Sequence, residues 1–210
     1  MEGDDVVSAV RESCATELDR LGSEKSLVAA TAAQLDRETV LASAATAEAR
    51  ARDTFTEWAE DTDHPDAHDA FEAVAETERT HYERVADLLK TPPTVPAPDT
   101  VHEYLRGLED PAERVGAGLV GRPLVAERSL LQVINFFVNE GDRQRADLFR
   151  ELRSDTGDTV DRGADLLDSV CDDEAAYERA HDAAVETIER AYEEYANDLE
   201  ELGIDPKPVC

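Results

Sequence analysis

Hydrophobic residues recur at every third or fourth position along most of the chain, and no stretch alternates with a period of two for long enough to form a strand. That spacing places apolar side chains on one face of an α-helix. The pattern therefore predicts an all-α protein. The expected helices cover residues 4–21, 24–61, 66–90, 99–108, 123–139, 142–170 and 173–202.

Prolines and glycines separate these helices. Residues 91–98 contain four prolines, which cannot continue a helix, so this segment is expected to be a stiff crossover linker. Gly116, Gly118 and Gly121 are expected to interrupt the chain before the helix that begins near Pro123.

The two long helix pairs on either side of the linker resemble each other. Phe71 precedes Glu78 by seven positions in the first pair, and Phe149 precedes Thr156 by seven positions in the second. Such a repeat indicates a duplicated helical hairpin, whose two copies bury their apolar faces against each other in a four-helix bundle. The expected segments are an N-terminal helix (1–22), the bundle (23–170), and a long C-terminal helix with its tail (171–210).

The chain is strongly acidic, with 50 Asp and Glu against 21 Lys and Arg and a net charge of -29. Such a surface repels phosphate backbones and anionic lipids, so neither nucleic acid nor a membrane is an expected partner. No apolar run approaches the ~18 residues of a membrane span. The three dispersed cysteines form neither a disulfide framework nor a metal knuckle, so we expect a cytoplasmic, reduced protein.

The kind of charge also bears on habitat. Only Lys25, Lys90 and Lys207 are lysines, and the other basic residues are arginines. This balance resembles that of proteins from salt-accumulating halophiles, in which molar salt screens repulsion between carboxylates. Folding is therefore expected to depend on high salt, and the regular apolar periodicity argues against disorder.

Four polar residues lie on the apolar faces of expected helices. Glu78 and His81 continue a stripe that includes Val85, while Glu48 and Glu127 continue the stripes of two other helices. A buried carboxylate is costly unless it is paired, protonated or bound to a cation. Carboxylates from facing helices, together with a Glu-x-x-His, are suitable ligands for iron or manganese in a bundle core. All four residues are therefore candidate metal ligands.

At these residues the chain resembles the rubrerythrin branch of the ferritin-like superfamily. Residues 41–55 are similar to the first ligand helix of that family, and residues 71–81 are similar to the second. Glu127 and the later turn at 139–142 resemble the third helix and the start of the fourth. The resemblance extends over roughly residues 30–165.

The resemblance implies a ferritin-like bundle with a di-iron site. It assigns Glu48 and His81 as terminal ligands of one iron, Glu78 as a bridge, and Glu127 as a ligand of the second iron. The family's C-terminal rubredoxin module, a four-cysteine iron site, has no counterpart in the sequence.

The chain departs from the family at the fourth helix. Where the family has a second Glu-x-x-His, this sequence has Thr156 and Thr159, and the adjacent Asp155 is expected to point away from the core. Glu178 and His181 would complete the ligand set if the last helix replaced the fourth one. The sequence is therefore compatible with two bound irons, with one, or with none.

Two functions remain open. One is a rubrerythrin-like non-haem iron oxidoreductase that reduces peroxide with electrons from an external donor. The other is a non-catalytic helical scaffold or regulatory interaction protein that keeps the bundle and has lost the chemistry. No catalytic residue is assigned, and the sequence leaves open whether the chain forms a homodimer.

Overall fold

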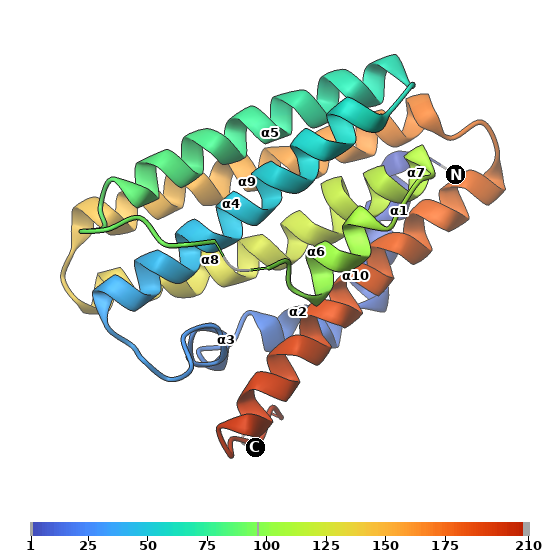
Figure 1. Cartoon of the computed structure of the whole chain (residues 1–210). Helices are drawn as coiled ribbons and strands as arrows, with labels where there is room; N and C mark the ends of the chain where they lie inside the picture. Colours follow the sequence, from blue (N-terminus) through green and yellow to red (C-terminus); the bar gives the residue numbers. More distant parts are fainter. Residues whose placement is uncertain (1, 96, 208–210) are drawn as a thin grey trace.

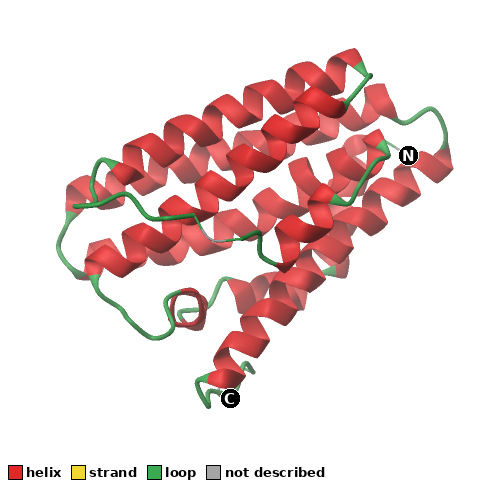
Figure 2. Ribbon diagram, viewed as in Figure 1, coloured by secondary structure: helices red, strands yellow, loops and turns green. Residues whose placement is uncertain are grey.

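The computed structural model describes residues 2–95 and 97–207, and every regular element among them is a helix (Figures 1 and 2). The predicted all-α class is confirmed. The elements are α1 (Gly3–Ser13), α2 (Ala15–Leu21), α3 (Lys25–Ala30), α4 (Arg37–Asp61), α5 (Pro65–Ala86), α6 (Thr100–Arg106), α7 (Pro111–Val115), η1 (Gly116–Gly121), α8 (Arg122–Asn139), α9 (Arg143–Val170) and α10 (Glu174–Glu201). Among these described helices, none is both long and apolar enough to span a membrane.

Four long helices form the bundle. α4 packs along α5, and α8 packs along α9, so that each pair is an antiparallel hairpin (Figure 1). α9 also lies against α5, which brings the two hairpins together around a shared interior. After α5, residues 87–95 return along the bundle toward α6, which begins at Thr100 (Figure 2). Of the expected crossover linker at 91–98, Pro96 lies outside the described residues.

Two hydrophobic clusters fill the interior. The Trp58 cluster contains Phe55, Trp58 and Phe71, and residues of α1, α2 and α10 also belong to it. The Phe149 cluster contains Phe137 and Phe149, whose rings stack with centroids 5.6 Å apart. The terminal helices thus share a core with the bundle.

A polar layer separates these two clusters. On α4, buried residues 40–45 belong to the Phe149 cluster and residues 51–59 to the Trp58 cluster, with Glu48 between them. Glu78 and His81 lie between the clusters on α5, and Thr156 and Thr159 do so on α9. All five side chains are buried, so the layer crosses the inside of the bundle.

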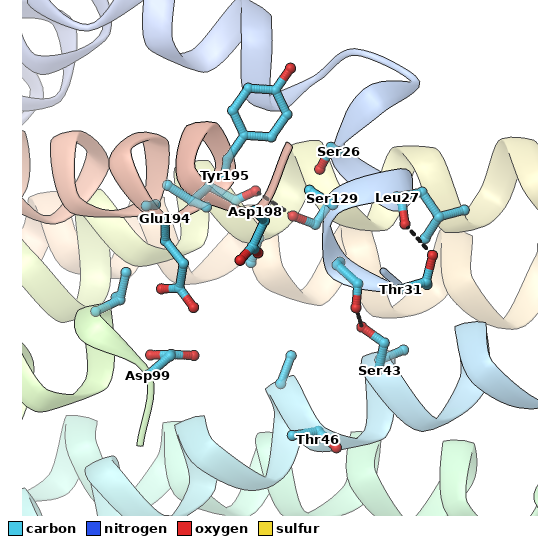
Figure 3. A pocket seen from close by; sticks show the side chains of 18 of the residues that line it. Ser26, Leu27, Thr31, Ser43, Thr46, Asp99, Ser129, Glu194, Tyr195 and Asp198 are labelled. Carbon is cyan, nitrogen blue, oxygen red and sulfur yellow. Dashed lines mark hydrogen bonds between the residues drawn. The ribbon is translucent and has the colours of Figure 1, made fainter. Parts of the chain in front are cut away.

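The helix expected at 24–61 is two helices, α3 and α4. Ala32 and Ala33 between them have positive φ angles of 48° and 62°. Asp36 then caps α4 by accepting hydrogen bonds from two backbone N–H groups of its first turn. This break leaves a cavity between α3, α4, α8 and α10 (Figure 3). The helix expected at 4–21 is likewise divided, at Cys14.

The glycines that were expected to interrupt the chain lie inside one continuous helical run. α7, η1 and α8 follow each other without a gap, and η1 is a π-helical stretch. A Cβ on Gly116 would lie 2.0 Å from the carbonyl oxygen of Ala180, and one on Gly121 would lie 2.7 Å from that of Ala184. The expectation was wrong because these glycines allow α10 to pack directly against the helix backbone.

Candidate metal centre

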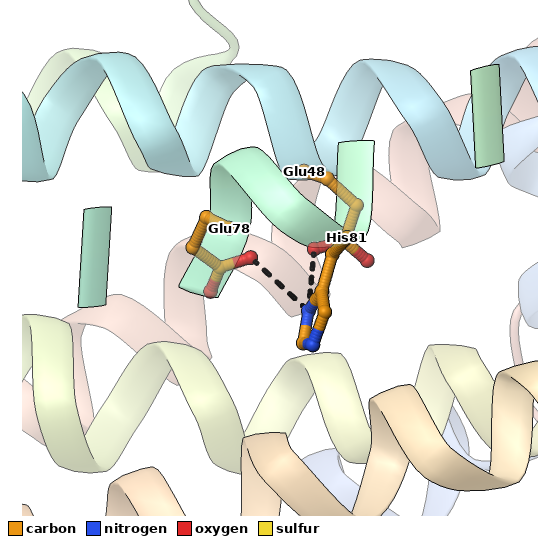
Figure 4. A group of neighbouring side chains, drawn as sticks. All are labelled: Glu48, Glu78 and His81. Atoms are coloured by element: carbon orange, nitrogen blue, oxygen red, sulfur yellow. Dashed lines mark ion pairs between the residues drawn. The ribbon is translucent and has the colours of Figure 1, made fainter. Parts of the chain in front are cut away.

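Three of the four predicted ligands meet in the polar layer. Glu48 comes from α4, while Glu78 and His81 are one turn apart on α5 and therefore share a face (Figure 4). Their exposed fractions are 6%, 4% and 2%. One donor atom from each residue lies within 4.8 Å of the others.

The distances within this group leave room for an ion. His81 Nδ1 is 3.7 Å from Glu48 Oε2 and 3.8 Å from Glu78 Oε2, too far for hydrogen bonds. Two atoms that each bind one metal ion at roughly 2 Å lie at most about 4 Å apart. Glu78 Oε2 and His81 Nδ1 are buried, and neither has a hydrogen-bond partner among the described residues.

Arg122, at the start of α8, neutralises the other oxygen of Glu78. Its Nη1 donates a buried hydrogen bond to Glu78 Oε1 at 2.7 Å, and its guanidinium lies 5.8 Å from the centre of the Phe55 ring. Burial works to raise the pKa of Glu78, but the charge of Arg122, with Glu48 and His81, lowers it below its ordinary value. Glu78 is therefore the anionic member of the group.

The other two members hold protons near neutral pH. Burial, and then the charge of Glu78, raises the pKa of Glu48 to about 8. Burial works to lower the pKa of His81, but the two neighbouring carboxylates raise it to about 10. A metal ion bound here would displace these protons, because ligands bind metals in their deprotonated form.

Asp155 on α9 contacts the far side of the His81 ring. Asp155 Oδ2 lies 3.1 Å from His81 Nε2, and the Asp155 side chain is 49% exposed. Asp155 does point away from the core, as expected, but His81 reaches from α5 to the edge of α9 and meets the carboxylate there. A carboxylate in this place fixes the ring orientation of a metal-binding histidine.

Glu127, the fourth predicted ligand, is not in the group. Its carboxylate is 22% exposed and lies 3.5 Å from the guanidinium of Arg153. Its side chain also faces Gly157 of α9. The part of the prediction that brings all four residues to one point is therefore not met, because an arginine on the neighbouring helix pairs with this carboxylate.

The threonines of α9 are buried, and their hydroxyl groups form hydrogen bonds within their own helix. Thr156 Oγ1 donates to the carbonyl of Leu152 at 2.9 Å, and Thr159 Oγ1 donates to that of Asp155 at 3.2 Å. Such bonds to the preceding turn are a usual way to satisfy a threonine inside a helix. These hydroxyls supply no charge for a second cation.

The last helix does not complete the ligand set. Glu178 is exposed, and His181 Nδ1 lies 3.0 Å from Asp182 of the same helix. α10 packs mainly on α7 and η1 and lies outside the four-helix bundle (Figure 1). Glu178 and His181 therefore do not join Glu48, Glu78 and His81.

The matched family model covers the part of the chain that supplies these three residues. Residues 26–99 fit the family model described as Rubrerythrin. This segment is therefore similar to the rubrerythrin family. No rubredoxin module is detected, and Arg122, Glu127 and α9 lie outside the rubrerythrin segment. No curated protein and no solved structure matches the chain.

The side chains around the rubrerythrin segment fit one metal ion better than two. Glu48, Glu78 and His81 offer buried donor atoms to one point, two of them without a partner. In the place where a second ion would need ligands, Glu127 faces Arg153 and the threonine hydroxyls bind backbone carbonyls. The guanidinium of Arg122 already supplies a positive charge to Glu78.

Sequence reasoning did not identify Arg122 or Asp155 as parts of this centre. Arg122 did leave a signal, since it is the one charged residue between Arg114 and Glu127 in an otherwise apolar segment. A lone charge in such a segment needs a buried partner. The partner, Glu78, lies in another hairpin, so the sequence alone did not name it.

Proposed function

We propose that Glu48, Glu78 and His81 bind one metal ion, and that this ion is iron. One observation carries the proposal: Glu78 Oε2 and His81 Nδ1 are buried, lack hydrogen-bond partners among the described residues, and lie 3.8 Å apart. Leaving both atoms unsatisfied is costly, and a cation bound by both removes that cost. Carboxylate and imidazole ligands suit iron.

Each residue around the ion has a distinct task. Glu48, Glu78 and His81 are the ligands, and Arg122 holds Glu78 in place while cancelling part of the negative charge of the two carboxylates. Asp155 accepts the proton of His81 Nε2 in a hydrogen bond and so leaves Nδ1 free for the metal.

The function that follows is a non-haem iron oxidoreductase related to the rubrerythrins. Iron supplies the capacity to exchange electrons with an oxidant and with a donor. We propose that the donor is an external protein or small molecule and that peroxide is the oxidant. With one iron instead of two, reduction of peroxide is expected to be slow.

The Arg122–Glu78 ion pair supports a second candidate function. Because a guanidinium already neutralises Glu78, the polar layer does not need a metal ion to balance that charge. Under this alternative the protein is a helical scaffold or regulatory interaction protein. The two candidates differ in whether the folded protein takes up iron.

Anaerobic loading with ferrous iron in molar KCl, followed by removal of free metal and elemental analysis, tests the proposal. We expect about one iron per chain, because one complete set of ligands is present. His81→Ala should reduce bound iron to near zero, whereas His181→Ala, on α10, should leave it unchanged. Oxidation of the bound iron by peroxide should produce a ferric absorption band that His81→Ala lacks.

His81→Ala could lose iron because it fails to fold, so a second variant, Glu48→Gln, removes a ligand while preserving the fold. Because the pKa of Glu48 is about 8, its carboxyl is largely neutral in the metal-free protein and an amide of the same shape should preserve the fold. Glu60→Gln, at an exposed position on the same helix, is the matched control. If metal-free Glu48→Gln folds normally and still binds iron as tightly as Glu60→Gln, Glu48 is not a ligand. If the unaltered protein takes up no iron, the scaffold function is favoured.

A further inference from the structure

A cavity of about 840 Å³ lies beside the candidate metal centre. Residues of α3, α4, α6, α8 and α10 line it, and it is partly open to solvent (Figure 3). Glu48 and Arg122 both belong to the lining. A water molecule takes up about 30 Å³ in the liquid, and a peroxide molecule is little larger. The cavity has instead the size of pockets that bind organic ligands, about 300–1,000 Å³.

Most of the cavity wall is apolar. Leu27, Val101, Val125, Leu130 and Val133 line it, together with several alanines. A ligand that fills this space therefore gains most from an apolar body.

The hydroxyl groups in the wall offer few free donors. Thr31, Thr46, Ser43 and Ser129 each donate to a backbone carbonyl. The two arginines in the lining are also engaged, Arg50 with Asp99 and Arg122 with Glu78. An anionic ligand would thus find no unpaired cation among these residues.

Carboxylates are the remaining charged groups in the lining. Glu194 and Asp198, one turn apart on α10, both extend into the cavity, and Asp99 faces Glu194 from the opposite side (Figure 3). Glu194 accepts a hydrogen bond from Thr100, but no hydrogen bond or ion pair of the Asp198 side chain is found in the described part of the chain. Like charges at this spacing destabilise a helix, and a cation between them removes the repulsion.

We propose that this cavity binds an organic cation with an apolar body, such as a primary amine on an alkyl chain. The ammonium group lies between Glu194 and Asp198, and the alkyl chain extends along the apolar wall toward Glu48. The inference goes beyond iron binding and does not depend on it, because Glu194 and Asp198 are not part of the metal centre.

Calorimetric titration of the metal-free protein, in the presence of a chelator and at constant salt, tests the proposal with three probes. Octylammonium carries the charge and the apolar chain, octanoate carries a similar chain with the opposite charge, and ethylammonium carries the charge with little chain. We expect octylammonium to bind at least about tenfold more tightly than either of the others. Equal binding of octanoate and octylammonium, or no binding of octylammonium, would overturn the proposal.

Variants locate the bound amine. The double variant Glu194→Gln, Asp198→Asn should weaken octylammonium binding about tenfold. The control Glu193→Gln, Glu200→Gln removes the same two charges from exposed positions of α10 and should have no effect. Ser129→Phe should abolish binding by filling the cavity, and Ser154→Phe on the exposed face of α9 should not.

Circular dichroism and thermal unfolding confirm that each variant compared is folded. Unchanged octylammonium binding in both folded cavity variants would overturn the proposed location. A protein that binds octylammonium but takes up no iron would retain this site while the proposed iron function fails. A protein that binds iron but no octylammonium would overturn the proposed amine site and leave the proposed iron function standing.

Discussion

The first hairpin, α4 and α5, and the second, α8 and α9, contribute very different side chains to the same polar layer. The first supplies Glu48, Glu78 and His81, whose donor atoms converge and are in part unsatisfied. The second supplies a glutamate paired with Arg153, and threonines bonded to their own helix. One hairpin presents ligands, and the other has every corresponding polar group satisfied.

This difference shows how a bundle can keep a polar layer while losing half of its capacity to bind cations. The second hairpin also sends Arg122 across the bundle to Glu78, so it contributes a fixed positive charge where ligands are absent. A guanidinium held by the chain neutralises a carboxylate without needing a metal ion. The two hairpins are thus complementary in charge.

The largest expected effect concerns the ion pair that joins the hairpins. Arg122→Met removes the partner of a buried carboxylate and should lower the free energy of unfolding by about 3–5 kcal/mol. Arg153→Met is the matched change within the second hairpin, where the pair is partly exposed, and should cost less than about 1 kcal/mol. Urea unfolding in constant salt measures both. Equal losses would show that the Arg122–Glu78 and Arg153–Glu127 ion pairs contribute equally to stability.

A smaller effect is a loss of stability in acid, and it arises where α6 packs on the first hairpin. Burial, only partly opposed by Asp99, lowers the pKa of His102 from 6.5 to about 4, and its Nδ1 lies 3.0 Å from Thr54 Oγ1 on α4. The unfolded chain therefore binds a proton near pH 6.5 that the folded protein does not bind until about pH 4. Stability should fall as pH decreases through this window, by up to about 3 kcal/mol.

Comparison of unfolding at pH 7 and pH 4.5 isolates this contribution. His102→Gln should reduce the pH dependence, whereas His68→Gln, at an exposed position on α5, should not. Hydrogen exchange at pH 4.5 should show α4 and α6 losing protection before α9. A pH dependence identical in His102→Gln and the unaltered protein would contradict the assignment.

The smallest expected effect tests whether an ion or ligand occupies the space beside Glu127 in the second hairpin. Gly157 follows Thr156 inside α9, and a Cβ there would meet only the Glu127 side chain, at 3.5 Å. Gly157→Ala should therefore stabilise the protein by about 0.5–1 kcal/mol, since glycine is unfavourable within a helix. Thermal unfolding measures the change. A marked destabilisation would indicate that the space beside Glu127 is occupied in solution.

The sequence predicted the fold well where apolar stripes are uninterrupted. The bounds of α9 and α10 differ by about one residue from the expected 142–170 and 173–202. The break before α4 was missed because Ala32 and Ala33 favour helices, and their positive φ angles are not encoded by residue type. Asp36 carried a capping signal for that boundary that the helical periodicity concealed.

The site was predictable to the extent that it depends on helical spacing. Glu78 and His81 share one face of one helix, and Glu48 was found from its own stripe, so three converging residues followed from local pattern. Glu127 also lies on a stripe, but its neighbour Arg153 decides where its carboxylate goes. Contacts between helices distant in sequence, such as Arg122 with Glu78, are not contained in the periodicity of either helix.

The π-helical stretch η1 joins α7 to α8 in one helical run and determines how far α8 is rotated about the helix axis relative to α7. Adding or removing a single residue turns everything that follows by about 100° around the helix axis. Arg122 is the first residue after η1, so the direction of its side chain toward Glu78 depends on the register that Gly116–Gly121 establishes. Loss of one of these residues would point the arginine elsewhere while leaving the composition of the polar layer intact.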